Sequence, residues 1–428
     1  MNPIIVTIAV LCITIILLIS EKVPLVAIGM LIPVVLTITG TIPAKQAFAR
    51  LSDNSVILVI GVFVLGKAFF KVGLADSIGQ SILRITGKFG NRESITLFLI
   101  MITAAAMSSV LSSLGVTIAM LSVVLPIADT IRISRTRAVL GLAYASTLGG
   151  MMTLIGTPLN LVGKAAYEAA YPAGSIGFLD LSLIGIPIGL LSIFFYCFIG
   201  IRYLPDRYQK PAEDAAGLKE QESASPVTER HRWSTVVIFL GFIVLVALDG
   251  NTPIPANIAS VMAMLAIGFT GVLSTQEIFR SIKWEIILFV VGMLTLSDTM
   301  TNVGFNDLIA DRVVNLLGAT PSVRMLIFVL FFVTILLTQF MGNSAALGVV
   351  MPLGLSVALG LKIDPKPVAM AITIAASCAF ATPMATQSYP MISGEGQLKF
   401  SDWVKQGLPI LVICSVYSIV VIPLIWPV

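Results

Sequence analysis

The sequence contains few charged residues and almost no histidine. Only 11% of its 428 residues are charged, histidine occurs once, at His231, and 57% of the residues are hydrophobic. Soluble domains carry about 25% charged residues, so this composition excludes an ordinary water-soluble fold. A bilayer-spanning helix needs roughly 20 mostly apolar residues, and such runs recur along nearly the whole chain. The sequence therefore predicts an all-α polytopic membrane protein.

Several kinds of functional site are also missing. The four cysteines, Cys12, Cys197, Cys378 and Cys414, lack metal-ligand spacing. No phosphate-binding loop, buried acid–base pair or activated nucleophile is recognisable. The net charge of +4 includes no basic cluster with interleaved aromatics. We therefore expect neither an enzyme nor an ATP-driven pump, and no nucleic-acid partner. Met1 to Ser20 lacks a basic start and a cleavage site, so we expect a retained first span.

Apolar runs predict about ten transmembrane helices. They lie near residues 3–20, 23–41, 54–73, 138–165, 176–201, 233–249, 254–273, 284–302, 366–391 and 406–426. Two longer apolar regions, about 95–130 and 324–361, are interrupted by Ser112-Ser113 and by Gly342-Asn343-Ser344. Non-helical backbone at membrane depth is tolerated where it is buried or lines a cavity. We therefore predict two re-entrant helical hairpins with their tips at a solute site. Ordinary paired spans are the alternative, and the positive-inside rule does not separate the two readings.

The spans divide into two halves. Residues 1–203 form a predicted first repeat with an inward hairpin, 204–232 a hydrophilic cytoplasmic linker, and 233–428 a second repeat with an outward hairpin. Five spans on each side of the linker place the second repeat upside down relative to the first. Local matches join Lys71–Asp76 to Asn302–Asp307, and Gly156-Thr157-Pro158 to Ala381-Thr382-Pro383. Inverted repeats with broken helices are typical of secondary carriers.

The polar groups inside the spans are almost all neutral. Proline at positions 158 and 383 removes a backbone donor and frees a carbonyl, and Thr157, Asn160 and Thr382 add polar side chains. Such neutral oxygens suit a hard monovalent cation, while helix N-termini suit an anion. Lys67 and Asp298 occupy equivalent repeat positions near span ends, where snorkelling or local pairing is expected. The absence of a clear midplane carboxylate favours a metal cation over a proton as the driving ion.

Three stretches carry a family resemblance that extends over almost the full length. Leu142–Gly150, Thr153–Asn160 and Phe380–Pro383, together with the two tips, resemble the divalent anion/sodium symporter family, the INDY-type di- and tricarboxylate carriers of the ion transporter superfamily. In that family each hairpin tip carries Ser-Asn-Thr. The second tip here keeps the amide and a hydroxyl, in Asn343 and Ser344. In the first tip, Ser113 stands in place of the family's asparagine and Leu114 in place of its threonine.

The resemblance implies binding residues for two sodium ions and one solute. One sodium site would use Ser108, Ser112 and the Gly156 carbonyl, and the other Thr338, Asn343 and the carbonyls of Met341 and Ala381. The solute would lie among Ser112, Ser113, Thr157, Pro158, Gly342, Asn343, Ser344, Thr382 and Pro383. The family also implies a homodimer that displaces its hairpin domain like an elevator.

We therefore expect a multi-pass inner-membrane symporter that imports a small divalent anion, a di- or tricarboxylate, with sodium as the coupling ion. Sulfate or another oxyanion is the alternative solute, because the altered first tip departs from the family pattern. An uncoupled anion exchanger or channel is a second class of function. A membrane enzyme or structural assembly protein is a third class, and it predicts no stabilisation by solute.

Overall fold

The computed structural model describes residues 2–20, 22–74, 93–205, 229–248, 252–305, 323–383, 385–386 and 388–427. Helices are the only regular elements in these ranges. The first part of the chain contains α1 (Pro3–Ser20), α2 (Leu25–Ile38), α3 (Asn54–Lys71), α5 (Glu93–Ser108), α6 (Ser113–Ile131), α7 (Arg135–Gly150), α8 (Pro158–Ala170) and α9 (Asp180–Phe198). The second part contains α10 (Glu229–Ala247), α11 (Ala256–Phe269), α12 (Thr275–Ser281), α13 (Trp284–Asn302), α15 (Val323–Thr338), α16 (Asn343–Gly360), α17 (Lys366–Ser377), α18 (Ser388–Ser393) and α19 (Phe400–Ile425).

The predicted all-α polytopic membrane fold is confirmed. Seven of the described helices, α3, α6, α9, α10, α13, α16 and α19, are long and apolar enough to cross a membrane. Six shorter apolar helices accompany them. Large apolar side chains such as Phe194, Leu240 and Val416 are more than half exposed, as expected where lipid replaces water as the solvent. The predicted linker 204–232 falls mostly on 206–228, outside the described residues, and α10 already begins at Glu229.

Helix breaks occur at the positions that the sequence indicates. Helix α5 ends at Ser108 and α6 begins at Ser113, while α15 ends at Thr338 and α16 begins at Asn343. We call α5–α6 the first hairpin and α15–α16 the second. The predicted spans 138–165 and 366–391 are each two helices, α7 with α8 and α17 with α18. Pro158 occupies the first position of α8, where its missing N–H leaves no helical bond unmade.

Backbone turns recur in the two halves of the chain. Gly40 and Gly271 have φ angles of 73° and 72°, Gly73 and Gly304 of 69° and 76°, and Arg132 and Lys362 of 59° and 57°. Members of each pair stand 230 or 231 positions apart, as their numbers show, and all lie in the left-handed region that ends helices. This recurrence supports the predicted repeat. The matched residues 75–76 and 306–307 lie outside the described part.

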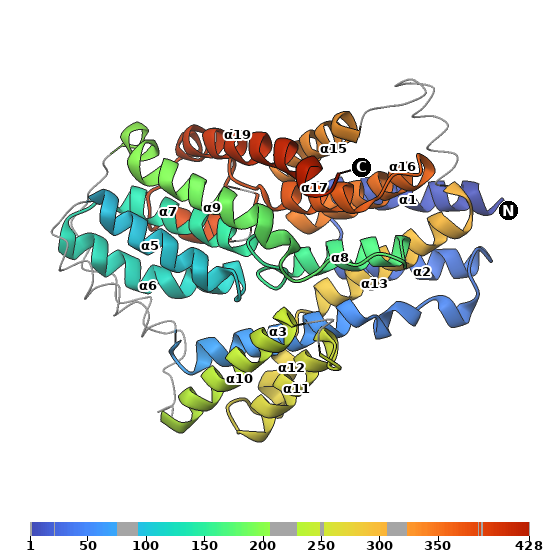
Figure 1. Cartoon of the computed structure of the whole chain (residues 1–428), viewed down its shortest axis with the longest axis horizontal. Coiled ribbons are helices and arrows are strands. Elements are labelled where there is room, and N and C mark those ends of the chain that lie inside the picture. Colours follow the sequence, from blue (N-terminus) through green and yellow to red (C-terminus); the bar gives the residue numbers. More distant parts are fainter. Residues whose placement is uncertain are drawn as a thin grey trace.

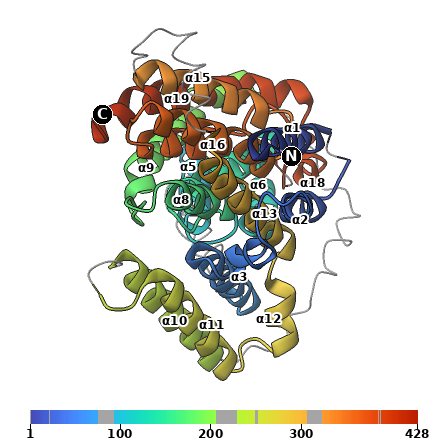
Figure 2. The ribbon, with the colours of Figure 1, turned by 90° about the vertical axis from the view of Figure 1, so that its right-hand side faces the viewer.

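Helices of the first half pack directly against helices of the second half. Figures 1 and 2 show α2 of the first half beside α13 of the second, and α3 beside α10, α11 and α12. Glycines permit this close approach, because an added Cβ on Gly292 would lie 2.0 Å from the Gly29 carbonyl oxygen and one on Gly61 2.5 Å from Ser260 Cβ. Small residues at helix crossings are the usual packing device inside membranes.

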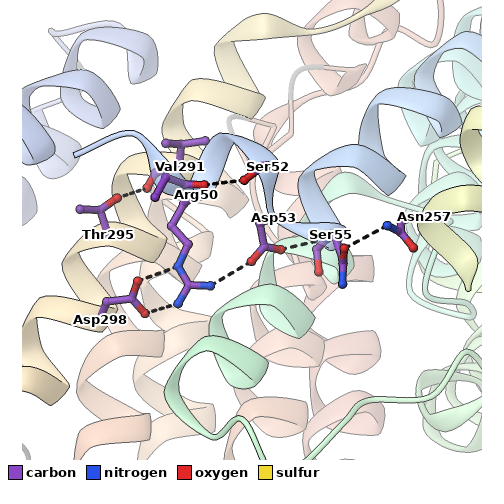
Figure 3. A network of polar contacts seen from close by, with 10 residues as sticks. Arg50, Ser52, Asp53, Ser55, Asn257, Val291, Thr295 and Asp298 are labelled. Carbon is purple, nitrogen blue, oxygen red and sulfur yellow. Dashed lines mark hydrogen bonds and ion pairs between the residues drawn. The ribbon is translucent and has the colours of Figure 1, made fainter. Parts of the chain in front are cut away.

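An ion pair also joins the halves. Arg50, which precedes α3, donates to both carboxylate oxygens of Asp298 on α13, at 2.6 and 2.5 Å, and to Asp53 at 3.1 Å (Figure 3). Asp53 in turn caps α3 by accepting the Ser55 N–H. Asp298 is therefore paired with an arginine close to it in space. Local pairing was one of the two behaviours, with snorkelling, expected for a charge near a span end.

Candidate solute and cation site

The two hairpin tips line one cavity of about 510 Å³. Ser112, Ser113 and Leu114 border it from the first tip, and Gly342, Asn343, Ser344 and Ala345 from the second. Thr147, Thr157, Pro158, Leu159, Ser377, Ala385, Thr386 and Ser388 border it from the broken helices, and Leu18, Lys22, Val23, Pro24, Leu25, Ile28, Glu285 and Ile286 from α1, α2 and α13. Most of the predicted solute residues are thus brought together.

The first tip is anchored through Ser108, the last residue of α5. Its fully buried hydroxyl contacts Ser113 Oγ at 2.9 Å and the Ser146 carbonyl oxygen of α7 at 2.5 Å. Gly150 leaves room beside this tip, because an added Cβ would lie 2.5 Å from Ser113 Oγ. Helix α7 therefore holds the tip in register with the α7–α8 break.

The second tip is anchored in the same way through Thr338, the last residue of α15. Its fully buried hydroxyl contacts Asn343 Oδ1 at 2.9 Å and the Ala376 carbonyl oxygen of α17 at 2.9 Å. Thr338, Asn343 and Ala376 each follow their first-half counterparts, Ser108, Ser113 and Ser146, by 230 positions. The two tips thus repeat one hydrogen-bond pattern.

This pattern offers neutral oxygens to a cation. A hydroxyl that donates its proton to a carbonyl keeps lone pairs that can face a metal ion. Ser108 with Ser113, and Thr338 with Asn343, supply such oxygens, and no group of three or more His, Cys, Asp or Glu suited to a metal occurs among the described residues. Oxygen ligands without formal charge suit sodium better than a soft or multivalent metal.

Three helices begin at the cavity without a side-chain cap. Ser112, Thr157 and Gly342 are the N-cap residues of α6, α8 and α16, they all line the cavity, and none accepts a capping hydrogen bond with its side chain. Backbone N–H groups at helix N-termini, with the positive end of the helix dipole, favour an anion. The cavity therefore combines neutral oxygens of the two tips with helix N-termini that favour negative charge.

One amide side chain holds the break between α7 and α8. Asn160 Nδ2 donates to the Gly150 carbonyl at 2.9 Å and to the Thr153 carbonyl at 2.7 Å. Thr153 Oγ1 donates to the carbonyl of Ser109 at the first tip. These bonds satisfy carbonyls that the break frees, and they join the broken helix to the hairpin.

A different amide, Gln339, holds the second break. Its Nε2 donates to the Cys378 carbonyl at 2.8 Å, and its Oε1 accepts the Ala381 N–H at 2.9 Å. Thr382 Oγ1 donates to the Gln339 carbonyl. Sequence reasoning missed Gln339, although a polar residue at the end of a long apolar run, next to a tip, could have indicated it.

The structure places some implied residues away from the cavity lining. Thr382 and Pro383 do not border it, and Thr386 and Ser388 take that place, with their hydroxyls 3.0 Å apart. Gly156 borders a second, smaller cavity together with Ser112. Met341 is buried next to the second tip. Of the two sodium sets implied by the resemblance, the hydrogen bonds between described residues join only Thr338 and Asn343, and the sets stay a prediction.

The cavity also contains polar groups that sequence reasoning missed. Ser377 is 3% exposed, borders the cavity and has a hydroxyl without a hydrogen-bond partner, and the Thr157 hydroxyl is also unpartnered. Buried polar atoms without a partner are rare in proteins and call for an explanation. Lys22 and Glu285 are the charged side chains among the described residues that line it, and both come from outside the hairpins.

The chain matches known transporters over most of its length. The profile of a protein family described as "citrate transporter" matches residues 15–375. An uncharacterised transporter of Haemophilus influenzae is 27% identical over 416 residues, which cover 93% of this chain and 86% of that protein. A sodium-dependent dicarboxylate transporter of Staphylococcus saprophyticus is 22% identical and covers 95% of this chain and 82% of its own length.

Solved structures share the fold. The YdaH transporter of Alcanivorax borkumensis superimposes with a TM-score of 0.66 at 13% identity, over 100% of this chain and 99% of that chain. The Neisseria gonorrhoeae MtrF structure gives a TM-score of 0.64 at 13% identity, over 100% of this chain and 95% of that one. These likenesses concern the arrangement of helices.

Proposed function

Because the chain belongs to the citrate transporter family, we propose that it is a sodium-coupled secondary carrier of a small divalent anion, a di- or tricarboxylate. It is a membrane transporter and not an enzyme, as its family and its relatives are. The relatives described as sodium-dependent dicarboxylate transporters support sodium as the coupling ion.

One observation carries the proposal. The hydroxyls of Ser108 and Thr338 bind corresponding partners in the two halves, and the tips they anchor line the same cavity. Sodium beside each hydroxyl would tie a tip to its broken helix and add positive charge next to the solute. Solute and sodium then favour each other's binding, which is the thermodynamic requirement for coupling.

The uncapped N-termini of α6, α8 and α16 supply the anion's side of the site. Carboxylate oxygens accept hydrogen bonds from backbone N–H groups without needing an arginine or lysine. Ser344, Ser377 and Thr157 add hydroxyls around the solute. Neutral partners also let the solute leave again, because a buried ion pair would hold it more tightly than a carrier needs.

The proposal extends to the arrangement of the repeats, the dimer and the transport movement. The halves 1–203 and 233–428 are inverted repeats in the inner membrane, and two copies form a homodimer. The hairpins pack on α7 and α17, so we propose that these helices move together past α1, α2 and α13 in an elevator-type step. Sulfate is the alternative solute, because apolar Leu114 stands at the cavity where the family pattern has a threonine.

Uptake by purified protein in proteoliposomes tests the proposal. We expect accumulation of radiolabelled succinate or citrate under an inward sodium gradient, and at least about tenfold less with potassium, because the larger ion fits the oxygen cage poorly. Sulfate is the parallel assay. Equal fluxes in sodium and potassium would favour an uncoupled exchanger or channel. No flux of any of the three anions would refute the assignment of solute class.

A further inference from the structure

Three buried oxygen atoms beside the main cavity have no hydrogen-bond partner among the described residues. They are Oγ1 of Thr157 and Oδ1 of Asn160, at the start of α8, and Oγ of Ser377, the last residue of α17. Asn160 is 1% exposed and Ser377 is 3% exposed. Buried polar atoms nearly always have a partner, which is a protein group, a water molecule or an ion. Three such oxygens in one region therefore indicate a bound partner.

The packing of α8 on α17 brings these oxygens to one place. An added Cβ on Gly163 of α8 would lie 2.3 Å from Thr373 Oγ1 of α17, so the two helices cross there. Asn160 precedes Gly163 by one helical turn and lies on the same face of α8. Ser377 follows Thr373 by one turn, on the same face of α17. Thr157 and Ser377 both border the main cavity, so both helices run from the crossing to the cavity.

The chemistry of these oxygens favours a cation over the anionic solute. Asn160 Nδ2 donates to the carbonyls of Gly150 and Thr153, at 2.9 and 2.7 Å. These two bonds use both amide hydrogens and fix the orientation of the side chain, so Oδ1 is left as an acceptor that would repel an anion. The two hydroxyl oxygens can also turn a lone pair to a cation. The start of α8 and the end of α17 carry dipole ends of opposite sign that offset each other.

We propose that Thr157, Asn160 and Ser377 form a third sodium site at the crossing of α8 and α17. Uncharged oxygen ligands suit sodium, and none of the three residues belongs to the two sodium sets implied by the family resemblance. This inference rests on the proposed function and adds a further coupling ion to it. A cation here joins the broken helix of the first half to a helix of the second. It lies at the wall of the main cavity, where its charge also favours the bound anion.

Thermal unfolding of the full-length protein at graded sodium chloride, without solute, tests this site. Potassium chloride keeps the ionic strength constant. A ligand that binds only the folded state raises the unfolding midpoint, so we expect the midpoint of the unmodified protein to rise with sodium. In Ser377→Ala the rise should be smaller by about one third, because the site loses a ligand oxygen and two of three sites remain. Thr157→Val removes a hydroxyl from a side chain of the same shape and should show the same loss.

Ser192→Ala is the matched control. Ser192 of α9 is also buried, and its hydroxyl also lacks a partner within the described ranges, but it lies outside the lining of the main cavity and on neither α8 nor α17. Without sodium, both alanine variants should keep or raise the midpoint, because each loses an unsatisfied buried hydroxyl. With sodium, Ser192→Ala should follow the unmodified protein.

The possible failures are distinguishable. A sodium response of Ser377→Ala equal to that of the unmodified protein would overturn the third site and assign its oxygens to bound water. A midpoint of the unmodified protein that does not respond to sodium would overturn the proposed sodium coupling, on which the site depends.

Discussion

Replacing Asn343 by alanine is expected to weaken sodium-dependent uptake strongly while the protein still folds. Asn343 Oδ1 is the 2.9 Å partner of the Thr338 hydroxyl, and the residue begins α16 at the edge of the cavity. In the proposed site, the alanine variant loses an amide that would face both the cation and the solute. A hydrogen bond to a charged group contributes about 1.5–3 kcal/mol, so sodium and solute affinities should fall about 10- to 100-fold. Radiolabelled uptake at graded sodium concentrations measures the loss.

Asn257→Ala is the matched control for that variant. Asn257 lies at the exposed start of α11 and donates to Asn54 Oδ1 at 3.0 Å, away from both tips. Its removal deletes the same functional group and should leave uptake unchanged. An Asn343→Ala protein with the sodium half-saturation of the unmodified protein would exclude the second tip from the coupling site.

Gly149→Ala is expected to damage the fold at the first hairpin. An added Cβ on Gly149 would lie 2.2 Å from the carbonyl oxygen of Ala105 on α5, closer than any real contact. The backbone of α5 cannot rotate away as a side chain does, so α5 and α7 must separate. Overpacking of this kind costs about 3 kcal/mol. We expect a clearly lower thermal unfolding midpoint and less monodisperse protein in size-exclusion chromatography.

The control for this clash is another helical glycine. Gly241 in α10 has open space around it, with no atom within 4 Å of an added Cβ. Gly241→Ala should keep or slightly raise the midpoint, because alanine favours helix more than glycine does. Equal midpoints for the Gly149 and Gly241 variants would show that α5 does not pack on α7 as closely as described.

The helix breaks were predictable from sequence because they have local causes. Ser112-Ser113 and Gly342-Asn343 interrupt apolar runs that are too long for one crossing, and the helices begin at Ser113 and Asn343. Pro158 likewise marks the start of α8 through its fixed φ and missing N–H. Span boundaries such as 284–302 were predicted equally well, since a break in apolar character is a property of neighbouring residues.

The contacts of the site could not be predicted, because they join residues far apart in the chain. The family resemblance placed Thr382 at the solute, yet its hydroxyl donates to the Gln339 carbonyl, and Thr386 borders the cavity instead. Nothing near Asp298 in the sequence identifies Arg50, 248 positions away, as its partner. Such pairings depend on which helices of one half pack against which helices of the other.

The most direct test measures whether bound solute protects both hairpin tips from chemical labelling. Leu114→Cys and Ser344→Cys each place a thiol at the cavity, in a protein with the exposed Cys12 changed to serine and the other three cysteines buried. The solute that passes the uptake assay should slow labelling of both thiols by a membrane-permeant maleimide, in sodium and not in potassium. Protection of only one thiol, or equal protection in potassium, would contradict a shared sodium-dependent site between the tips.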